Sequence, residues 1–281
     1  MIKFVYVASP KKRDEYNSFL KKVELNYPIE EYDKEKSYSL SDTYFLIIGG
    51  DGTLNYFVSQ FHFDFKPNVI YIPLGTANDF SKSVLPNIPQ LESIDISRIL
   101  KRDTAINVPI MKLNDKRFIN VATCGAPAEV TQEADSGMKQ TIGQVSYYLA
   151  GFKKFFTENV LSIKVEIDGK SIDIETCGFV ISQGLYAGGG IRVNPSFTAC
   201  FGDDFSFLST NDGKMSSSIQ AISELTISNE IEAKDELEMH FIKKLKIKSD
   251  SIIPVKLDGE YYESSELIFE KSDHSIKLFL Y

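Results

Sequence analysis

The first hundred residues alternate between short apolar runs and amphipathic segments, and this alternation limits the folds open to the chain. The apolar runs IKFVYVAS, YFLIIGG and NVIYIPLG are typical of buried strands, and KKRDEYNSFLKKVELN and TLNYFVSQFH are typical of helices. Continuously apolar strands separated by helices indicate a parallel sheet that helices cover on both faces. The sequence therefore predicts an N-terminal α/β domain with a parallel sheet.

The pattern changes after residue 103. Short strands then follow one another through hairpin-like turns, at Asn114-Asp115 and at Asp168-Gly169, and the series ends in HSIKLFLY. Helical segments at 136–159 and 216–238 interrupt it. We predict two domains, an α/β domain over 1–103 and a β-rich, antiparallel sandwich-like domain over 104–281, and leave open whether the last strand returns to the first domain.

Charge and cysteine content exclude several classes of protein. The net charge of −8 and the pI near 5.1 argue against a nucleic-acid partner, which would require a basic surface. The three cysteines are far apart and form no CxxC pair, so neither a disulfide framework nor a zinc site is indicated. No apolar run reaches the 18 residues of a membrane span. We therefore expect a cytoplasmic protein.

The motif GGDGT, from Gly49 to Thr53, lies between an apolar strand and a helix. In that position, glycine N–H groups and a helix N-terminus converge on an anion, so the motif predicts a phosphate-binding turn. The alternative is an ordinary tight turn, because Gly-Asp-Gly also forms these after strands.

A second polar turn follows the next strand. NVIYIPLG runs into Gly75, Thr76, Asn78 and Asp79, and the carboxyl ends of neighbouring parallel strands meet at one edge of a sheet. We expect the two turns to form one site. In it, Thr76, Asn78 and Asp79 supply hydrogen bonds and help to position a metal. Alternatively, Asn78 or Asp79 only caps the following helix.

These motifs together resemble one family. GGDGTLN and IPLGTANDF, followed by YAGGGIRVNPSFTA and VKLDGE, are similar to the catalytic region of the diacylglycerol kinase and sphingosine kinase superfamily. The resemblance implies a two-domain, NAD-kinase-like lipid kinase fold. It also implies Mg²⁺-dependent transfer of the γ-phosphoryl group of ATP to a membrane-derived lipid alcohol, with diacylglycerol as the first guess.

The resemblance also assigns residues. Asp51 would work with Mg²⁺ or accept the hydroxyl proton, and Glu260 would be the general base; Asp51, Asp79 and Asp258 would support the metal. The alternatives are that Asp51 ties its loop by accepting backbone N–H bonds and that KLDGEYYES is a plain β-turn. The expected ATP contacts are Ser9, Gly49, Gly50, Gly52, Thr53, Gly75, Thr76 and Asn78.

The chain departs from the family at four places. VASPKK, with Ser9, replaces an Asn-Pro loop after the first strand, and Tyr56 replaces a glutamate. Asn107 and Phe201 stand where the resemblance expects aspartates, and Asp203 or Asp204 are candidate substitutes. We favour an active lipid kinase over two rivals, a catalytically impaired lipid- or nucleotide-binding protein and an NAD kinase.

Access to a lipid is the last question that the sequence raises. The helix expected over Met138–Phe156 either shields an acyl-chain pocket at the bilayer or is an ordinary core helix, and periodicity does not separate the two. A lipid kinase has to reach a membrane, so we expect transient, peripheral contact with its surface. Homodimer formation is left open.

Overall fold

The computed structural model describes residues 2–39, 42–61, 66–85, 87–124, 160–167, 169–195, 201–210, 214 and 237–281. The helix expected over Met138–Phe156 lies outside these residues. Among the described residues, no helix is both long and apolar enough to cross a bilayer.

The N-terminal half is built on four parallel strands. Their order is β4-β3-β1-β2, with bounds β1 (Lys3–Ala8), β2 (Ile29–Glu31), β3 (Thr43–Gly49) and β4 (Asn68–Pro73). The helical elements are η1 (Pro10–Lys12), α1 (Arg13–Glu24), α2 (Asp51–Gln60), α3 (Asp79–Val84), η2 (Leu91–Ser93) and α4 (Ile96–Arg102). The sequence did not suggest β2, which is only three residues long and forms the edge of the sheet.

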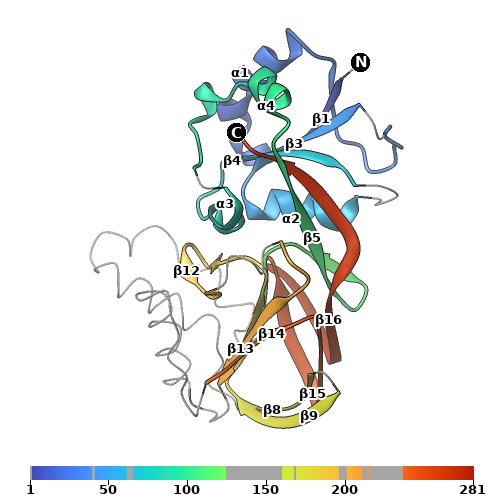
Figure 1. The fold of residues 1–281 in the computed structure, drawn as a ribbon, viewed down its shortest axis with the longest axis vertical. Helices are drawn as coiled ribbons and strands as arrows, with labels where there is room; N and C mark the ends of the chain where they lie inside the picture. Colours follow the sequence, from blue (N-terminus) through green and yellow to red (C-terminus); the bar gives the residue numbers. More distant parts are fainter. Residues whose placement is uncertain are drawn as a thin grey trace, which may run out of the picture.

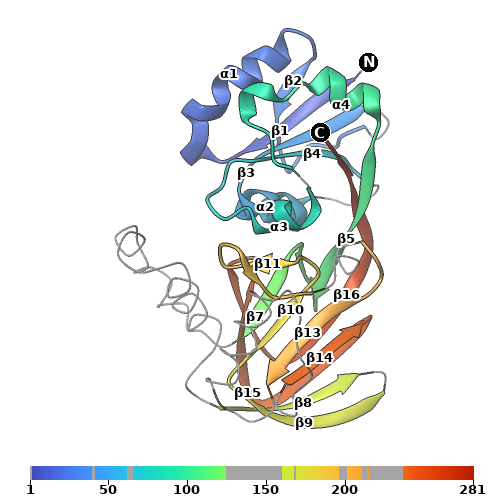
Figure 2. The same cartoon turned by 60° about the vertical axis from the view of Figure 1, so that its left-hand side comes forward.

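Both faces of this sheet are covered, as its apolar strands predict. Along β3, Phe45 and Ile47 pack in one cluster with α2 and α3, while Leu46 and Ile48 pack in another with α1 and α4. Successive side chains of a strand point to opposite faces, so a strand buried on both has to be apolar throughout. Helices α2 and α3 lie on the face toward the β-rich half (Figures 1 and 2).

The C-terminal half is an antiparallel sheet around its own core. A separate two-stranded hairpin, β11 (Tyr186–Ala187) with β12 (Ile191–Arg192), lies below α3 (Figure 2). The strands of the main sheet are β5 (Ala105–Leu113), β6 (Lys116–Phe118), β7 (Val121–Cys124), β8 (Leu161–Ile167), β9 (Lys170–Thr176), β10 (Phe179–Ser182), β13 (Phe205–Thr210), β14 (Leu237–Ile242), β15 (Lys244–Leu257) and β16 (Glu260–Phe279). The core is made largely of aliphatic and phenylalanine side chains.

Strand β16 belongs to both halves. It pairs with β15 and with β5, and then Lys277 and Leu278 pair in parallel with Asn68 and Val69 of β4. One continuous sheet therefore connects the two halves (Figure 1). A division into domains at residue 103 stays a prediction.

Candidate functional site

The two glycine turns expected at the carboxyl edge of the parallel sheet touch each other. Leu74 N–H donates to the Gly49 carbonyl at 2.9 Å. A Cβ atom added to Gly75 would lie 2.4 Å from the Cα atom of Gly50. A side chain at Gly75 would push the two turns apart. Only glycine fits at this position, because the two backbones touch there.

Asp51 connects the two turns. It is the first residue of α2, and its carboxylate accepts hydrogen bonds from the backbone N–H groups of Asp79 (2.9 Å) and Phe80 (3.1 Å). It therefore satisfies the first donors of α3, a helix that its own N-cap residue Asn78 leaves without a side-chain bond. Burial raises the pKa of the Asp51 carboxyl, and these N–H donors and the charge of Lys82 oppose that shift. The hydrogen bonds are those of the loop-tying alternative, and the catalytic and metal roles of Asp51 stay predictions.

Asn78 and Asp79 have separate structural tasks. Asn78 has a left-handed backbone (φ 51°), and its side chain closes the turn by bonding to Gly75 N–H (2.9 Å) and Gly75 carbonyl (2.7 Å). Asp79 is 4% exposed, and its Oδ2 accepts the N–H of Gly189 in the β11–β12 turn at 2.8 Å. Its Oδ1 is buried and has no hydrogen-bond partner among the described residues. Burial raises the pKa of Asp79, and nearby Asp51 adds to the shift. Neither side chain caps α3.

The Asp-Gly-Glu turn between β15 and β16 contains one partly buried and one exposed carboxylate. Asp258 accepts backbone N–H bonds from Ile119 (2.7 Å), Asn120 (3.0 Å) and Val121 (2.8 Å). Burial raises its pKa to about 7, against the effect of these three donors. Glu260 is exposed, and its side chain makes no hydrogen bond or ion pair within the described chain. Asp258 therefore secures the β6–β7 connection, and Glu260 is free to meet a ligand.

Tyr71 of β4 carries a hydroxyl group within a strand that the sequence predicted as apolar. The sequence predicted no role for this residue. It is 1% exposed, and its hydroxyl has no hydrogen-bond partner among the described residues. Burial raises the pKa of Tyr71 well above its usual range, and Asp51, Asp79 and Asp258 add to the shift. A buried hydroxyl without a partner in the described chain marks Tyr71 as a polar group in the core of the sheet.

A cavity of about 340 Å³ opens beside the start of α2. It brings together three predicted ATP contacts, Ser9, Gly52 and Thr53, whereas Gly49, Gly50, Gly75 and Asn78 lie outside its lining and Thr76 is exposed. Its volume is within the range of small-molecule sites. The other lining residues, not expected from the sequence except for the substitution at Tyr56, are Tyr6, Val7, Ala8, Pro10, Glu31, Tyr32 and Tyr56.

The unusual residues Asn107 and Phe201 lie apart from this cavity. Asn107 is exposed on β5, and Phe201 packs against the core cluster that contains α2 and α3. Asp203 and Asp204 are exposed, and Asp203 forms an ion pair with Lys243 at 3.4 Å. In the described part of the chain, no group of three or more His, Cys, Asp or Glu side chains could hold a metal by itself.

Comparisons with known proteins identify the family of the chain. A model described as the diacylglycerol kinase catalytic domain matches residues 13–113, and one described as the YegS C-terminal NAD kinase beta sandwich-like domain matches residues 120–279, more than half of the chain. Proteins named diacylglycerol kinase from Bacillus subtilis (strain 168) and Staphylococcus carnosus (strain TM300) are each 30% identical, over 148 and 150 residues. Each match covers 52% of this chain and 48% of the relative, so it spans about half of the relative's length.

Solved structures confirm the predicted fold class. A diacylglycerol kinase of Bacillus anthracis str. Sterne superposes with a TM-score of 0.68 at 17% identity, over 98% of this chain and 96% of that one. An NAD kinase from Archaeoglobus fulgidus in complex with ATP gives 0.53 at 13% identity, over 99% and 93%. The fold is thus that of a two-domain, NAD-kinase-like protein. The chain belongs to the family that joins a diacylglycerol kinase catalytic domain to a YegS-type C-terminal domain.

Proposed function

We propose that this protein is a kinase that transfers the γ-phosphoryl group of ATP to the hydroxyl group of a lipid alcohol, with diacylglycerol as the first candidate. The observation that carries the proposal is the cavity at the N-terminus of α2, where Ser9, Gly52 and Thr53 meet. The family's catalytic-domain model and the names of the relatives support the reaction class and the choice of diacylglycerol.

The phosphates of ATP fit the end of the cavity beside α2. This helix has ten residues, and its N-terminus favours negative charge. Apart from the chain neighbours of Gly52 and the backbone of its own helix, no heavy atom of the described residues lies within 4 Å of the position that its Cβ would occupy, so a phosphate oxygen has room to approach. Thr53, one residue further along α2, lines the same space.

Mg²⁺ fits the carboxylates of Asp51 and Asp79, which lie outside the cavity lining. It is commonly held by one or two carboxylates together with substrate phosphates, so a cage made only of protein ligands is not required. Asp79 Oδ1 is a buried oxygen without a partner among the described residues, and Asp51 lies beside it. When bound, the ion would neutralise charge on the transferred phosphoryl group. Asp258 is already committed to three N–H donors, so we assign it a smaller part in holding the metal.

The chain's own groups then orient the reactants. Asp51 fixes the start of α3 to the start of α2, and so holds the two turns at one spacing. Glu260 is the accessible carboxylate of the Asp-Gly-Glu turn and is our candidate for accepting the proton of the acceptor hydroxyl. Phosphoryl transfer depends mainly on such positioning and on charge neutralisation.

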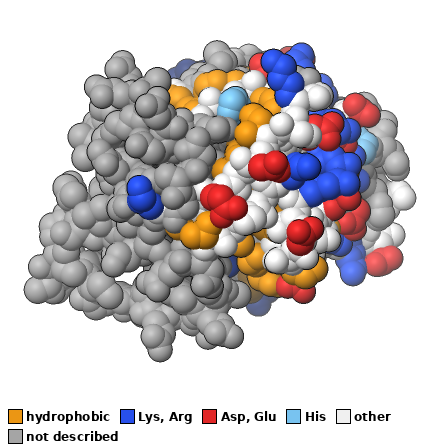
Figure 3. Space-filling model, turned by 90° about the horizontal axis from the view of Figure 1, so that it is seen from below, with side chains coloured by type: hydrophobic (Ala, Val, Ile, Leu, Met, Phe, Trp, Pro, Cys, Tyr) orange, Lys and Arg blue, Asp and Glu red, His pale blue; other side chains and the backbone are white. Residues whose placement is uncertain are grey.

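The acceptor is expected to come from a membrane by transient contact. Acidic and basic side chains are interspersed on the face of the β-rich half seen from below (Figure 3). On β15 and β16, lysines are paired with glutamates, as in Lys246–Glu266 (2.7 Å) and Lys244–Glu270 (2.9 Å). These lysines of β15 and β16 are therefore neutralised by glutamates, which is consistent with brief docking on an anionic bilayer.

The test is transfer of labelled γ-phosphate from ATP, with Mg²⁺, to diacylglycerol, monoacylglycerol, ceramide, sphingosine and NAD. We expect a labelled lipid with the wild-type protein and a loss of kcat of roughly 10²–10⁴-fold in Glu260→Gln. The matched control is Glu263→Gln, an exposed glutamate on the same strand, which should keep wild-type turnover. Asp51→Asn is a poorer probe, because one carboxylate oxygen that accepts an N–H would become an N–H₂ donor.

Each other result selects a different function. Label on NAD alone would replace the lipid kinase by an NAD kinase. ATP binding without transfer to any acceptor would identify a binding protein on a kinase fold. If Glu260→Gln turns over like the wild type, the kinase stands and the base is another group.

A further inference from the structure

Three tyrosines, Tyr6, Tyr32 and Tyr56, line the part of the cavity that we call its aromatic end. Tyr32 is fixed by its neighbours: its ring stacks on Tyr38 at 5.7 Å and meets Phe57 edge-on at 5.8 Å. Tyr56, 49% exposed on α2, lines the same cavity. Aromatic rings stack readily on the flat face of any nucleobase, whichever polar groups its edge carries. This end of the cavity therefore suits the base of the nucleotide, with its phosphates toward Gly52.

One charged side chain, Glu31, lines this aromatic end. Glu31 and Tyr6 are direct partners in the parallel pairing of β2 with β1, so their side chains point to the same face of the sheet. Tyr6 Oη donates to Glu31 Oε2 at 3.3 Å. Within the described residues the Glu31 carboxylate accepts this one hydrogen bond. Its Oε1 atom therefore remains available as an acceptor.

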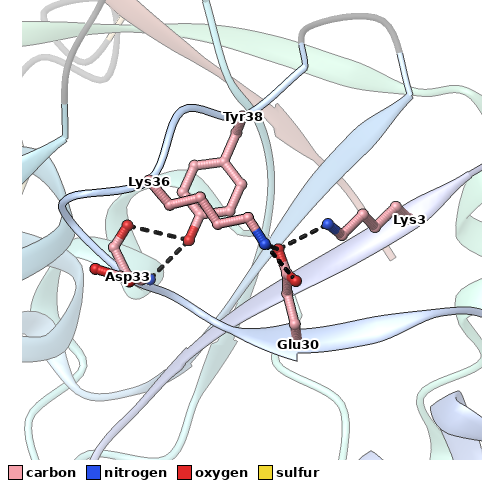
Figure 4. Close-up of polar contacts among 5 residues, drawn as sticks. All are labelled: Lys3, Glu30, Asp33, Lys36 and Tyr38. Atoms are coloured by element: carbon pink, nitrogen blue, oxygen red, sulfur yellow. Dashed lines mark hydrogen bonds and ion pairs between the residues drawn. The ribbon is translucent and has the colours of Figure 1, made fainter.

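The preceding residue, Glu30, shows why Glu31 keeps its charge uncompensated. Glu30 Oε1 lies 2.7 Å from Lys3 Nζ, and its Oε2 lies 2.7 Å from Lys36 Nζ (Figure 4). Both lysines are therefore committed to Glu30. Tyr38 accepts the backbone N–H of Asp33 at 2.6 Å and so closes the loop that presents Glu31 and Tyr32 to the cavity. The loop that carries Glu31 is thus held in place by these contacts.

We infer that Glu31 selects the base of the nucleotide by accepting a hydrogen bond from an exocyclic amino group, as adenine carries. This inference rests on the proposed function, because it assumes that the cavity holds a nucleotide. A carboxylate only accepts hydrogen bonds, so it favours an amino group and repels a carbonyl oxygen at the same position. Inosine triphosphate differs from ATP in having that carbonyl, and therefore binds more weakly.

The test is competition binding, in which ATP and ITP each displace a fluorescent ATP analogue from the full chain. We expect the wild-type protein to prefer ATP by about tenfold, as for one hydrogen bond to a charged group at a partly exposed site. In Glu31→Gln the preference should fall to roughly one- to threefold, and ITP should bind more tightly than to the wild type, because the amide can donate to its carbonyl. If Glu31→Gln only disturbed the local structure, the variant would bind both ATP and ITP more weakly.

Two further variants isolate the base-reading role. Glu35→Gln changes the charge equally on a side chain that is 82% exposed and outside the cavity lining, and it should keep the wild-type preference. Tyr56→Ala removes a stacking surface and should weaken both nucleotides by about tenfold without changing their ratio. Equal binding of ATP and ITP to the wild type, or an unchanged preference in Glu31→Gln, overturns the inference and leaves the kinase proposal intact. Failure of the wild type to bind any nucleotide overturns both.

Discussion

Gly52→Ala is expected to raise the thermal stability of the protein and to lower its affinity for ATP. Gly52 is the second residue of α2 and lines the cavity. Beyond its chain neighbours and its own helix backbone, no heavy atom of the described residues lies within 4 Å of the position that its Cβ would take. An alanine therefore enters the folded chain without displacing a protein atom. Its methyl group occupies the space in which we place a phosphate oxygen.

The two effects have opposite signs and can be estimated separately. Alanine is more favourable than glycine in a helix by about 0.5–1 kcal/mol, and the first turn places this site at the lower end. In a chain of this size the melting temperature should rise by about 1–3 °C. A phosphate oxygen that no longer reaches the backbone of α2 loses a charge-assisted hydrogen bond, and the affinity for ATP should fall roughly tenfold to hundredfold.

The assays are thermal denaturation without nucleotide and calorimetric titration with ATP and Mg²⁺ on the same preparation. Ser59→Ala is the matched control, because Ser59 is exposed on the same helix and outside the cavity lining. It should bind ATP like the wild type. Wild-type affinity in Gly52→Ala would show that the phosphates do not pass over the start of α2. A lower melting temperature would contradict the open space described at this position.

Two further substitutions probe the contact between the turns and the buried carboxylates. Gly75→Ala places a Cβ 2.4 Å from Gly50 Cα, so we expect it to lower the free energy of unfolding by about 1–3 kcal/mol; a wild-type urea midpoint would refute this. Burial raises the pKa of Asp79, so the folded state keeps a proton that the unfolded state loses above its ordinary pKa of 3.8. Stability contributed by this group therefore falls as pH rises through that window, and Asp79→Asn should flatten the decline in urea titrations above about pH 4. A difference between variant and wild type that is the same at every pH would show that Asp79 does not titrate in this way.

The sequence predicted the elements of the site better than their connections. The strand–turn–helix pattern around GGDGT placed β3, α2 and the first turn, because apolar periodicity and glycine are local signals. The contact of Asp51 with the N–H groups of Asp79 and Phe80 joins residues 28 and 29 positions apart. It depends on β4 lying beside β3, which no local pattern specifies.

The aromatic end of the cavity was missed for a similar reason. Tyr6 lies in an apolar strand, and Glu31 follows in a three-residue strand too short to give a periodic signal. Only the pairing of β1 with β2 brings their side chains together. Asn78 was left open between a helix cap and a ligand, and its left-handed backbone gives it a third task, closing its own turn.

The path of β16 has a consequence for how the chain is made. During synthesis from the N-terminus, β1, β3 and β4 emerge early, but the strand that pairs with the open side of β4 follows about 200 residues later. Until then the buried residues of β4, such as Val69 and Ile70, belong to an edge strand, and unpaired apolar edges invite association between chains. The N-terminal sheet can therefore be completed only after Lys277 and Leu278 have been made. A nascent chain of this protein passes through a long interval in which β4 has β3 on one side and no strand on the other.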